Sequence, residues 1–324
     1  MPDIEYYTGA YTGEEIDAYL TKAKNGSNPN LLDNWFFVGG GTGSGVFPVN
    51  QRGQASYSGN IPAFDRWRTE NSGGQAISLT NAGVQIVGTS SQYQGIVQLF
   101  ENPSLFEGKT VTISALFSDG TLQTASGTIT LPSSNSVLFR AGSDTSGNAT
   151  TFLYGSTSHF SFRIRCAVNC TKTVVAAKLE LGNTQTLAHQ ENGVWVLNEI
   201  PNYLQELAKC QRYLLVFKNE YQHNSGATNY NKLGLYVCYA DGACNLFVPT
   251  PVTMRPSSSP TVSGTVRIVR TNPTKGGLGN STALVIETMS QSGVSLIANN
   301  SNLSIGDIGW CDIDNTTVTI SCEL

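Results

Sequence analysis

The sequence predicts an all-β protein built from two β-sandwich or jelly-roll domains, with a short N-terminal helix and a short connecting helix. Most strand-length segments alternate apolar and polar residues, the period-two pattern of a strand with one buried face. Clusters of Gly, Pro, Asn, Asp and Ser separate these segments at short intervals, as the turns of a sandwich do. No helix-period segment lies between them as a crossover connection, so a parallel α/β fold is not expected.

The first predicted element is a short helix over residues 12–24. Thr12 and Glu15 have the spacing of a capping box, in which each side chain can bind the backbone NH of the other residue. Four apolar residues then recur at the spacing of one helix face: Ile16, Tyr19, Leu20 and Ala23. Because a helix of about 12 residues is marginal alone, residues 1–29 are expected to anchor the chain by packing on a docking partner or on copies of themselves. The alternative is a helix that folds back onto the adjacent sandwich.

Residues 30–196 are predicted to form the first sandwich, of the jelly-roll type. Its expected strands are 84–87, 96–100, 110–117, 127–131, 160–164 and 173–175. Turn signals such as Asp119-Gly120 separate them. Trp35 lies in the first apolar run of this segment, where a place in the core is the simplest interpretation.

Residues 197–212 change character and predict the connecting helix. Pro201 suits the first turn of a helix, and Leu204, Leu207 and Ala208 supply an apolar stripe. Residues 213–324 return to strand patterns and predict a second, smaller sandwich. Its expected strands are 213–217, 233–239, 244–248, 261–269, 283–286 and 316–320.

The seven cysteines are irregularly spaced and odd in number, so most are expected to be small buried apolar residues. Cys166 and Cys170 lack the further ligands that a tetrahedral metal site needs. Cys238 and Cys244 flank a turn. A three-residue loop there would place them opposite one another, whereas a two-residue Asp-Gly turn would offset them by one. A disulfide between them is left open.

Composition and charge restrict the partners. Charged residues make up 13% of the chain, the net charge is −4, and no segment carries a basic run. Nucleic acid is therefore not expected as a partner. No apolar run approaches the roughly 20 residues of a membrane span, so membrane insertion is not expected. The N-terminus has neither the basic nor the apolar region of a signal peptide, which predicts synthesis in a cytoplasm.

Several motifs point to one class of protein when they are taken as a group. Four lie in the first sandwich: Asn30-Leu31-Leu32-Asp33-Asn34-Trp35, Pro48-Val49-Asn50-Gln51-Arg52-Gly53-Gln54, Asp65-Arg66-Trp67 and Lys178-Leu179-Glu180-Leu181-Gly182. A fifth lies in the second sandwich: Val252-Thr253-Met254-Arg255-Pro256. Together they resemble phage and prophage tail fibre proteins that contain a domain like a carbohydrate-binding module. The resemblance covers most of residues 6–262.

The resemblance implies a receptor-binding virion protein that assembles as a homotrimer and attaches through its N-terminus to other virion proteins. It implies that residues 213–324 are a distal head domain and that bacterial surface polysaccharide is the ligand. The expected location is the virion, after synthesis in the bacterial host cytoplasm without a signal peptide. Host attachment through glycan binding, without enzymatic activity, is therefore the expected function.

Glycan binding needs aromatic faces for sugar rings and planar polar groups for hydroxyls. The aromatic and arginine side chains considered in the first sandwich are Trp35, Tyr57, Arg66, Trp67, Tyr93 and Trp195, of which Tyr57, Arg66, Trp67 and Tyr93 are the candidate site residues. Tyr57 and Tyr93 lie in Gly-, Ser- and Gln-rich segments and are expected to be exposed. Alternation places Trp67 on the opposite face from its neighbouring arginines, so core packing competes with a ligand-facing role. Asp65 next to Arg66 suggests a structural ion pair.

The second sandwich offers a polar loop over residues 219–230 with two aromatic residues and several amides. Its candidates for receptor contact are Tyr221, His223 and Tyr230. Loops on a rigid β scaffold commonly carry binding residues. An ordinary solvated loop is the alternative.

No cofactor and no catalytic residue are expected. A structural calcium ion is suggested by the resemblance to carbohydrate-binding modules, with Asp33 and Glu180 as the candidate oxygen ligands. No motif pairs two carboxylates as glycoside hydrolysis requires, and none of the three histidines lies in a metal motif.

Three alternatives stay open. The first is a capsid-attached head fibre or decoration protein with a mainly structural role. The second is a polysaccharide depolymerase, which needs a carboxylate pair in a groove. The third is a bacterial carbohydrate-binding module without a virion role, against which the N-terminal helix counts.

Overall fold

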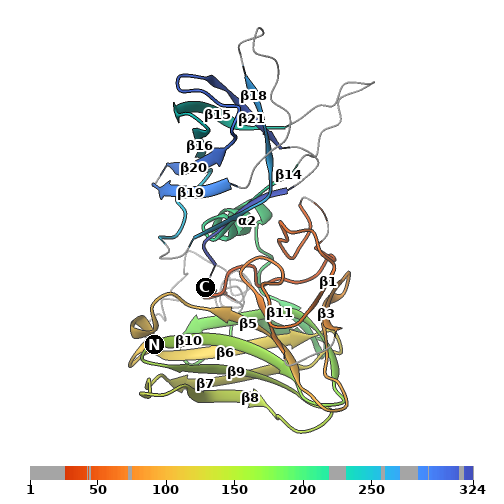
Figure 1. Cartoon of the computed structure of the whole chain (residues 1–324). Helices are drawn as coiled ribbons and strands as arrows, with labels where there is room; N and C mark the ends of the chain where they lie inside the picture. The colour runs from red at the N-terminus through yellow and green to blue at the C-terminus, as the bar shows by residue number, and fades with distance from the viewer. Residues whose placement is uncertain are drawn as a thin grey trace, which may run out of the picture.

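The computed structural model describes residues 26–41, 43, 45–71, 75–218, 231–256, 260–270, 284–290, 292–313 and 317–323. The expected N-terminal helix lies outside these residues. The described chain is all-β, with antiparallel sheets and one short α-helix, as the sequence predicts (Figure 1).

Two sheets form the first sandwich. The six-stranded sheet has the order β1 (Ser56–Ser58), β3 (Gln75–Thr80), β4 (Gly83–Val87), β11 (Thr171–Leu181), β6 (Thr110–Phe117) and β7 (Leu122–Thr128). The five-stranded sheet has the order β2 (Arg68–Asn71), β5 (Gln94–Leu99), β10 (His159–Cys166), β9 (Ala149–Ser156) and β8 (Ser136–Gly142). A short 3-10 helix, η1 (Pro103–Phe106), follows β5.

The apolar sides of these two sheets enclose the first hydrophobic core. Trp35 is 3% exposed, as expected from its place in the first apolar run. Trp67 lies at the centre of an aromatic group. Its ring centroid is 5.4 Å from that of Phe37 and 6.2 Å from that of Phe162, and both contacts are edge to face. Edge-to-face contacts of this kind add to the stabilisation that burial of the rings already provides.

The first and last motifs of this sandwich lie side by side. Leu31 donates its backbone NH to the carbonyl of Leu179 at 2.8 Å. The amide of Asn30 donates to the carbonyl of Ala177 at 2.9 Å and accepts from the NH of Leu179 at 3.2 Å. The chain therefore enters the sandwich against β11, the strand that carries the last motif.

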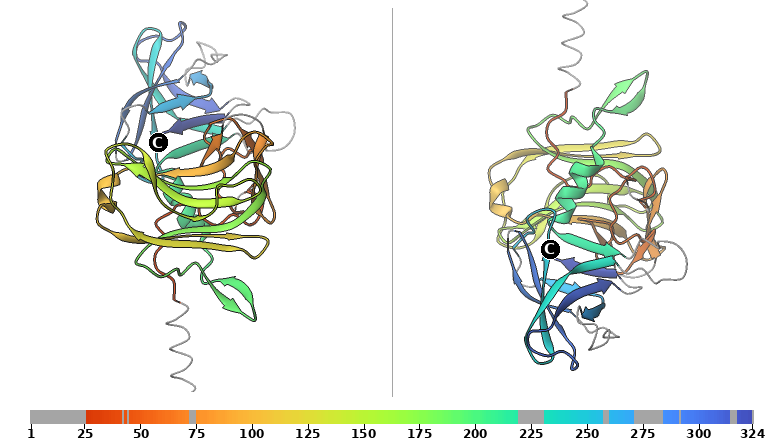
Figure 2. Two further views of the ribbon diagram at one scale, coloured as in Figure 1. Left: turned by 90° about the horizontal axis from the view of Figure 1, so that it is seen from below. Right: turned by 90° about the horizontal axis from the view of Figure 1, so that it is seen from above.

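A projecting hairpin and the connecting helix follow. The hairpin consists of β12 (Ala188–Glu191) and β13 (Val194–Leu197) and extends away from the sandwich (Figure 2). Helix α2 (Tyr203–Gln211) begins at the N-cap Asn202, whose side chain accepts from the NH groups of Leu204 and Gln205. The expectation that Pro201 lies in its first turn is wrong, because Pro201 precedes this cap.

The buried face of α2 also differs from the expected apolar stripe. Leu204 is exposed, whereas Glu206 and Cys210 are buried. The carboxylate of Glu206 accepts from the backbone NH of Asn34 at 2.6 Å and pairs with Lys209 at 2.6 Å. A polar contact with the first sandwich therefore orients this helix.

Two further sheets form the second sandwich. The three-stranded sheet has the order β14 (Leu214–Lys218), β22 (Thr317–Ser321) and β17 (Thr261–Ser263). The six-stranded sheet has the order β18 (Val266–Arg270), β21 (Ile308–Ile313), β15 (Asn231–Ala240), β16 (Ala243–Pro249), β20 (Gly293–Asn299) and β19 (Leu284–Met289). One buried cluster draws on residues 32–188 and the other on residues 215–322. The domain limits given above stay a prediction.

The segment 261–269, expected as one strand, is two strands in different sheets. Gly264, with φ of +104°, separates β17 from β18. A Cβ at this position would lie 2.2 Å from the carbonyl oxygen of Thr317. Glycine is therefore required both by the backbone angle and by the close approach of β22.

Cys238 and Cys244 lie opposite one another across the turn between β15 and β16, but this turn follows neither of the two expected geometries. The turn has two residues, Asp241 and Gly242, and Ala240 is paired with Ala243. A register shift between Cys238 and Ala240 then places Cys238 directly opposite Cys244. The bulge therefore cancels the offset expected of a two-residue turn. Both thiols are buried, and they form no disulfide with each other.

The two sandwiches meet at a polar junction. The side-chain amide of Gln51 donates to the carboxylate of Asp65 at 2.7 Å and to the carbonyl of Leu214 at 2.8 Å. Arg52 of the first sandwich pairs with Glu323 of the second. These contacts tie β14 and the C-terminal segment to the loops that precede β1 and β2.

Asp65 predicts a pH dependence of stability. The pKa of Asp65 is raised to about 7, mainly because the side chain is buried. The hydrogen bonds from Gln51 and the charge of Arg52 act in the opposite direction and lower this pKa. Between about pH 4 and pH 7 the folded state therefore holds more protons at this site than the unfolded state. The contribution of Asp65 to the free energy of unfolding is therefore fully present below pH 4 and is lost as the pH rises through 7. At about 1.4 kcal/mol per unit of pKa difference, the total loss is roughly 4 kcal/mol.

Urea unfolding of the wild type and of Asp65→Asn at a series of pH values measures this effect. Asparagine does not titrate, so the variant is expected to gain stability relative to the wild type between pH 4 and pH 8. The difference between the two proteins isolates Asp65 from all other titrating groups. A difference that stays constant over this range would contradict the assignment.

Candidate functional site

The outer face of the five-stranded sheet carries an unusual density of charged and aromatic side chains. On β10, alternation sends Phe162 and Ile164 into the core and Arg163 and Arg165 to the outer face. Arg163 lies opposite Val97 of β5 and Phe152 of β9. These side chains therefore stand together on one surface.

Glu70 of β2 joins the two arginines. One carboxylate oxygen accepts from the guanidinium groups of both Arg163 and Arg165, the latter at 2.8 Å. Arg165 also pairs with Asp144 at 3.3 Å. The side chains of Glu70, Arg163 and Arg165 are 12%, 14% and 16% exposed. Charge-assisted hydrogen bonds in such a half-enclosed site hold side chains in defined positions.

Gly95 of β5 makes room for this arrangement. It lies in register between Glu70 of β2 and Arg165 of β10. A Cβ at Gly95 would lie 2.7 Å from the carbonyl oxygen of Ile164 and 3.3 Å from a carboxylate oxygen of Glu70. The missing side chain therefore lets Glu70 reach across β5.

Aromatic rings flank the arginines. The guanidinium of Arg163 lies 4.1 Å from the ring centroid of Tyr154, and that of Arg165 lies 4.0 Å from the ring of Tyr93. Arg165 also lies 4.8 Å from the ring of Phe152, which it helps to bury. Cation–π contacts of this kind favour flat, stacked arrangements.

His159 completes this surface at the start of β10. Its Nε2 lies 3.2 Å from the hydroxyl of Ser161 and 3.4 Å from Arg163. Partial burial, followed by the charge of Arg163, lowers the pKa of His159 below its usual value. At neutral pH the imidazole is therefore uncharged and offers one donor and one acceptor.

A groove of about 350 Å³ lies over these residues. We call it the sheet groove; it is lined by Asn60, Arg68, Thr69, Glu70, Tyr93, Val97, Leu99, His159 and Arg163. A second hollow of about 280 Å³ lies on the other side of Tyr93 and Arg165. Tyr93 is 40% exposed and borders both, so the part of its ring that Arg165 does not cover is available to a ligand.

The sheet groove has the chemistry needed to bind a polyhydroxylated ring. Guanidinium groups donate, the Glu70 carboxylate accepts, and aromatic rings offer apolar faces. The charged residues of the lining are Arg68, Arg163 and Glu70, that is, two arginines and one carboxylate. A ligand with acidic substituents is therefore favoured.

Among the expected site residues that the structure describes, only Tyr93 lines the sheet groove. Tyr57 is 2% exposed, and its hydroxyl binds the side chain of Asn50 at 3.1 Å and the carbonyl of Gln54 at 2.8 Å. The expectation that Tyr57 is exposed is therefore wrong. Trp67 is fully buried and donates its indole NH to the carbonyl of Asn34 at 3.0 Å, so its ring offers no face to a ligand.

Arg66 serves the junction between the sandwiches instead of the groove. Its Nε donates to Asp33 at 2.9 Å, and its guanidinium lies 3.5 Å from the ring centroid of Tyr213. The expected ion pair with Asp65 is replaced by this one, because Arg66 adopts a positive φ of 71° and points toward Asp33. Tyr221, His223 and Tyr230 lie outside the described residues.

The two candidate calcium ligands have separate partners. Asp33 pairs with Arg66, whereas Glu180 accepts from the NH of Thr186 at 2.7 Å and lies 3.9 Å from Lys178. Within the part of the chain that the structure describes, no group of three or more His, Cys, Asp or Glu residues could hold a metal ion. The geometry around Asp33 and Glu180 is thus that of hydrogen-bonded and ion-paired carboxylates.

Sequence reasoning missed most of the sheet groove. The alternation of residues 159–165 was a usable signal, because it places His159, Arg163 and Arg165 on the face opposite Phe160, Phe162 and Ile164. Glu70 carried no comparable signal. It belongs to a four-residue strand, and its partner Arg163 is 93 positions away.

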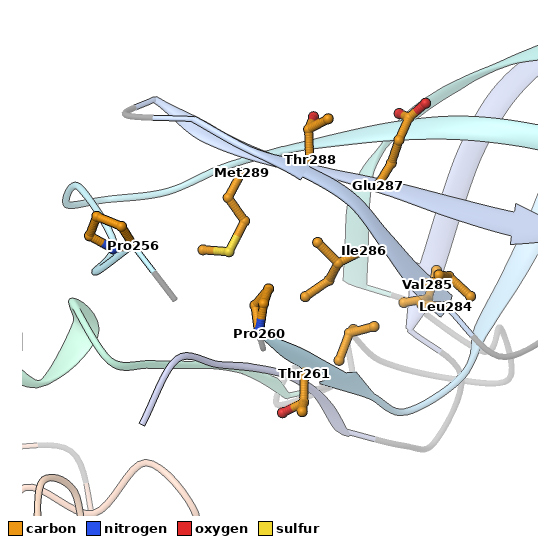
Figure 3. A pocket seen from close by; sticks show the side chains of 10 residues that line it. Pro256, Pro260, Thr261, Leu284, Val285, Ile286, Glu287, Thr288 and Met289 are labelled. Atoms are coloured by element: carbon orange, nitrogen blue, oxygen red, sulfur yellow. The ribbon is translucent and has the colours of Figure 1, made fainter. Parts of the chain in front are cut away.

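A larger cavity, of about 750 Å³, lies between β17 and β19 of the second sandwich. Ile286 and Met289 point toward Pro260 and Thr261 across this space, while Glu287 and Thr288 project from the other side of β19 (Figure 3). Its lining is mostly aliphatic and lacks the convergent polar groups of a glycan site. The segments 257–259 and 271–283, which adjoin its walls, lie outside the described residues.

No family model matches the sequence, and neither curated proteins nor solved structures provide a match. Within the described ranges no helix is long and apolar enough to cross a membrane.

Proposed function

We propose that this chain is a phage or prophage virion fibre protein that assembles as a homotrimer and binds host cell-surface glycans. The sheet groove is the proposed binding site, and the ligand is a bacterial polysaccharide with acidic substituents. Attachment to other virion proteins is assigned to the N-terminal segment. The function is binding without catalysis.

One observation carries the proposal. The outer face of the five-stranded sheet, on which the sheet groove lies, combines an exposed tyrosine ring with two guanidinium groups that a shared carboxylate holds in place, and one of these groups, that of Arg163, lines the groove. An outward sheet face needs only polar residues for solubility, so an interlocked array of arginine, glutamate and aromatic side chains is more than solvation requires. Preorganised donors and rings reduce the ordering cost of ligand binding.

The charge of the lining supports the ligand class. The positively charged Arg68 and Arg163 outnumber Glu70, and His159 is neutral because its pKa is lowered. Carboxylate or phosphate groups of a polysaccharide can accept from a guanidinium, whereas neutral sugars gain only ordinary hydrogen bonds. Binding should therefore weaken as salt rises.

The proposed function is tested by calorimetric titration of the full chain with neutral, uronic-acid-containing and phosphate-containing bacterial polysaccharides. Saturable binding to an acidic member is expected. Tyr93→Ala should weaken it by about tenfold, because it removes the exposed ring. Tyr93→Phe keeps the ring and should bind nearly as the wild type does.

Two outcomes would contradict the proposal. One is a folded protein that binds none of the polysaccharides. The other is saturable binding that Tyr93→Ala leaves unchanged, which would move the site away from the sheet groove. Preference for neutral polysaccharides would overturn the ligand class alone.

A further inference from the structure

The outer face of the six-stranded sheet in the second sandwich is apolar, although no described part of the chain covers it. On β15, Leu233, Tyr236 and Cys238 face the core. The intervening residues Leu235, Val237 and Tyr239 face outward, and Leu235 is 74% exposed. A sheet face that meets water normally carries polar residues at these positions.

Neighbouring strands extend this apolar surface. Trp310 lies opposite Leu235, and Ile308 lies opposite Val237. Phe247 of β16 lies over Gly293 of β20, where a Cβ would come within 2.4 Å of its ring. We call the following set the distal apolar face: Leu235, Val237, Tyr239, Phe247, Val285, Ile297, Ile308 and Trp310.

The distal apolar face is large enough to form an interface. Six strands about 4.8 Å apart, with roughly five residues each rising about 3.3 Å, give a projected area on the order of 400 Å². Standing side chains expose more accessible surface than this projection. The projected area is about half of the roughly 800 Å² that each partner buries in a stable complex, and it lies within the roughly 300–600 Å² of the largest apolar patch on a typical monomer.

Charged groups lie at opposite ends of this face. At the β21 end, Lys232 lies 4.4 Å from the ring centroid of Trp310, and Arg267 pairs with Asp312 at 3.2 Å. At the β19 end, Glu287 accepts hydrogen bonds from Asn245 and Ser295. The basic end of one copy can therefore meet the acidic end of another while the apolar residues are buried.

We propose that the distal apolar face is the surface through which copies of this chain associate. The occupant is a second copy, because the face carries opposite charges at its two ends and is mostly aliphatic and aromatic between them. The polar Asn245 of β16 lies on this face opposite Val237, and its side chain already donates to Glu287. It offers few donors and acceptors to a glycan. The number of copies, three, rests on the proposed function, whereas the surface itself rests on burial and charge.

Thiol protection tests the surface in the full chain. All seven native cysteines are buried, so the thiol introduced by Val237→Cys should dominate the reaction with a maleimide. Val194→Cys, at a similarly exposed valine on β13, is the matched control. In the assembled protein the thiol at 237 should react at least tenfold more slowly than that at 194, and dilution to the monomer should abolish the difference. Equal rates in the assembled protein would overturn the proposal.

Sedimentation equilibrium supplies the second measurement. Leu235→Glu should raise the dissociation midpoint at least tenfold, because it buries a charge in the interface. Leu105→Glu, at an exposed leucine of η1, should leave the midpoint unchanged. A wild type that stays monomeric at every concentration also overturns the proposal. Titration of Leu235→Glu with polysaccharide distinguishes failure of the proposed association surface from failure of the proposed glycan site, because a monomer should still bind through the sheet groove.

Discussion

Replacing Glu70 with alanine is expected to lower the free energy of unfolding by about 3 kcal/mol. The variant leaves Arg163 and Arg165 side by side, each about 15% exposed, without the carboxylate that they share. Breaking a buried pair by removing one partner costs about 3–5 kcal/mol, and the partial exposure here reduces that cost. Urea unfolding at neutral pH measures the change.

Asp119→Ala is the matched control for this prediction. Asp119 pairs with Lys172, and the two side chains are 42% and 31% exposed. An exposed pair of this kind contributes about 1 kcal/mol or less. Equal losses for Glu70→Ala and Asp119→Ala would show that Glu70 does not hold the two arginines. Glu70→Gln retains an acceptor and should fall between the wild type and Glu70→Ala.

Replacing Lys178 with methionine is expected to cost about 3–5 kcal/mol of unfolding free energy. Lys178 and Glu180 lie on the face of β11 opposite the core, yet both side chains are 0% exposed. The Lys178 ammonium donates to Ser27 and lies 3.4 Å from Glu199 and 3.9 Å from Glu180. Its removal would leave Glu180 buried without a cation.

The double variant Lys178→Met/Glu180→Gln tests this explanation. A neutral glutamine needs no cation and can still accept from the NH of Thr186, so part of the lost stability should return. Lys172→Met, which removes a partly exposed lysine, should cost about 1 kcal/mol or less. If Lys178→Met unfolds at the same urea concentration as Lys172→Met, the buried pair contributes nothing to stability.

The strands with clear alternation were predicted well. The expected segment 110–117 coincides with β6, and the expected 160–164 lies within β10. Seven strands between residues 30 and 197 were not expected: β1, β2, β3, β8 and β9 of the first sandwich, and β12 and β13 of the projecting hairpin. β1, β2, β12 and β13 have at most four residues, too few for a period to emerge, and β3 has six. In the second sandwich β20 and β21 were missed, since glycine interrupts or opens their apolar runs.

The candidate site residues were predicted poorly, because exposure is not a local property. Tyr57 and Tyr93 both lie in polar, glycine-containing segments, but the first is buried against Asn50 and Gln54 and the second borders the sheet groove. Trp67 is buried in the core, which is the alternative that the alternation around it had left open. Composition around a tyrosine therefore did not separate a structural ring from one that a ligand can reach.

By itself the sequence determined the all-β class, the short connecting helix and the faces of the strongly alternating strands. These properties depend on neighbours two to four residues away, which a sequence contains directly. The tertiary structure alone decided that Glu70 of β2 reaches Arg163 and Arg165 of β10 across Gly95. It also decided that Lys178 and Glu180 are buried on an outward face. Both outcomes depend on sheet order and on covering segments, and these bring together residues that are distant in the chain.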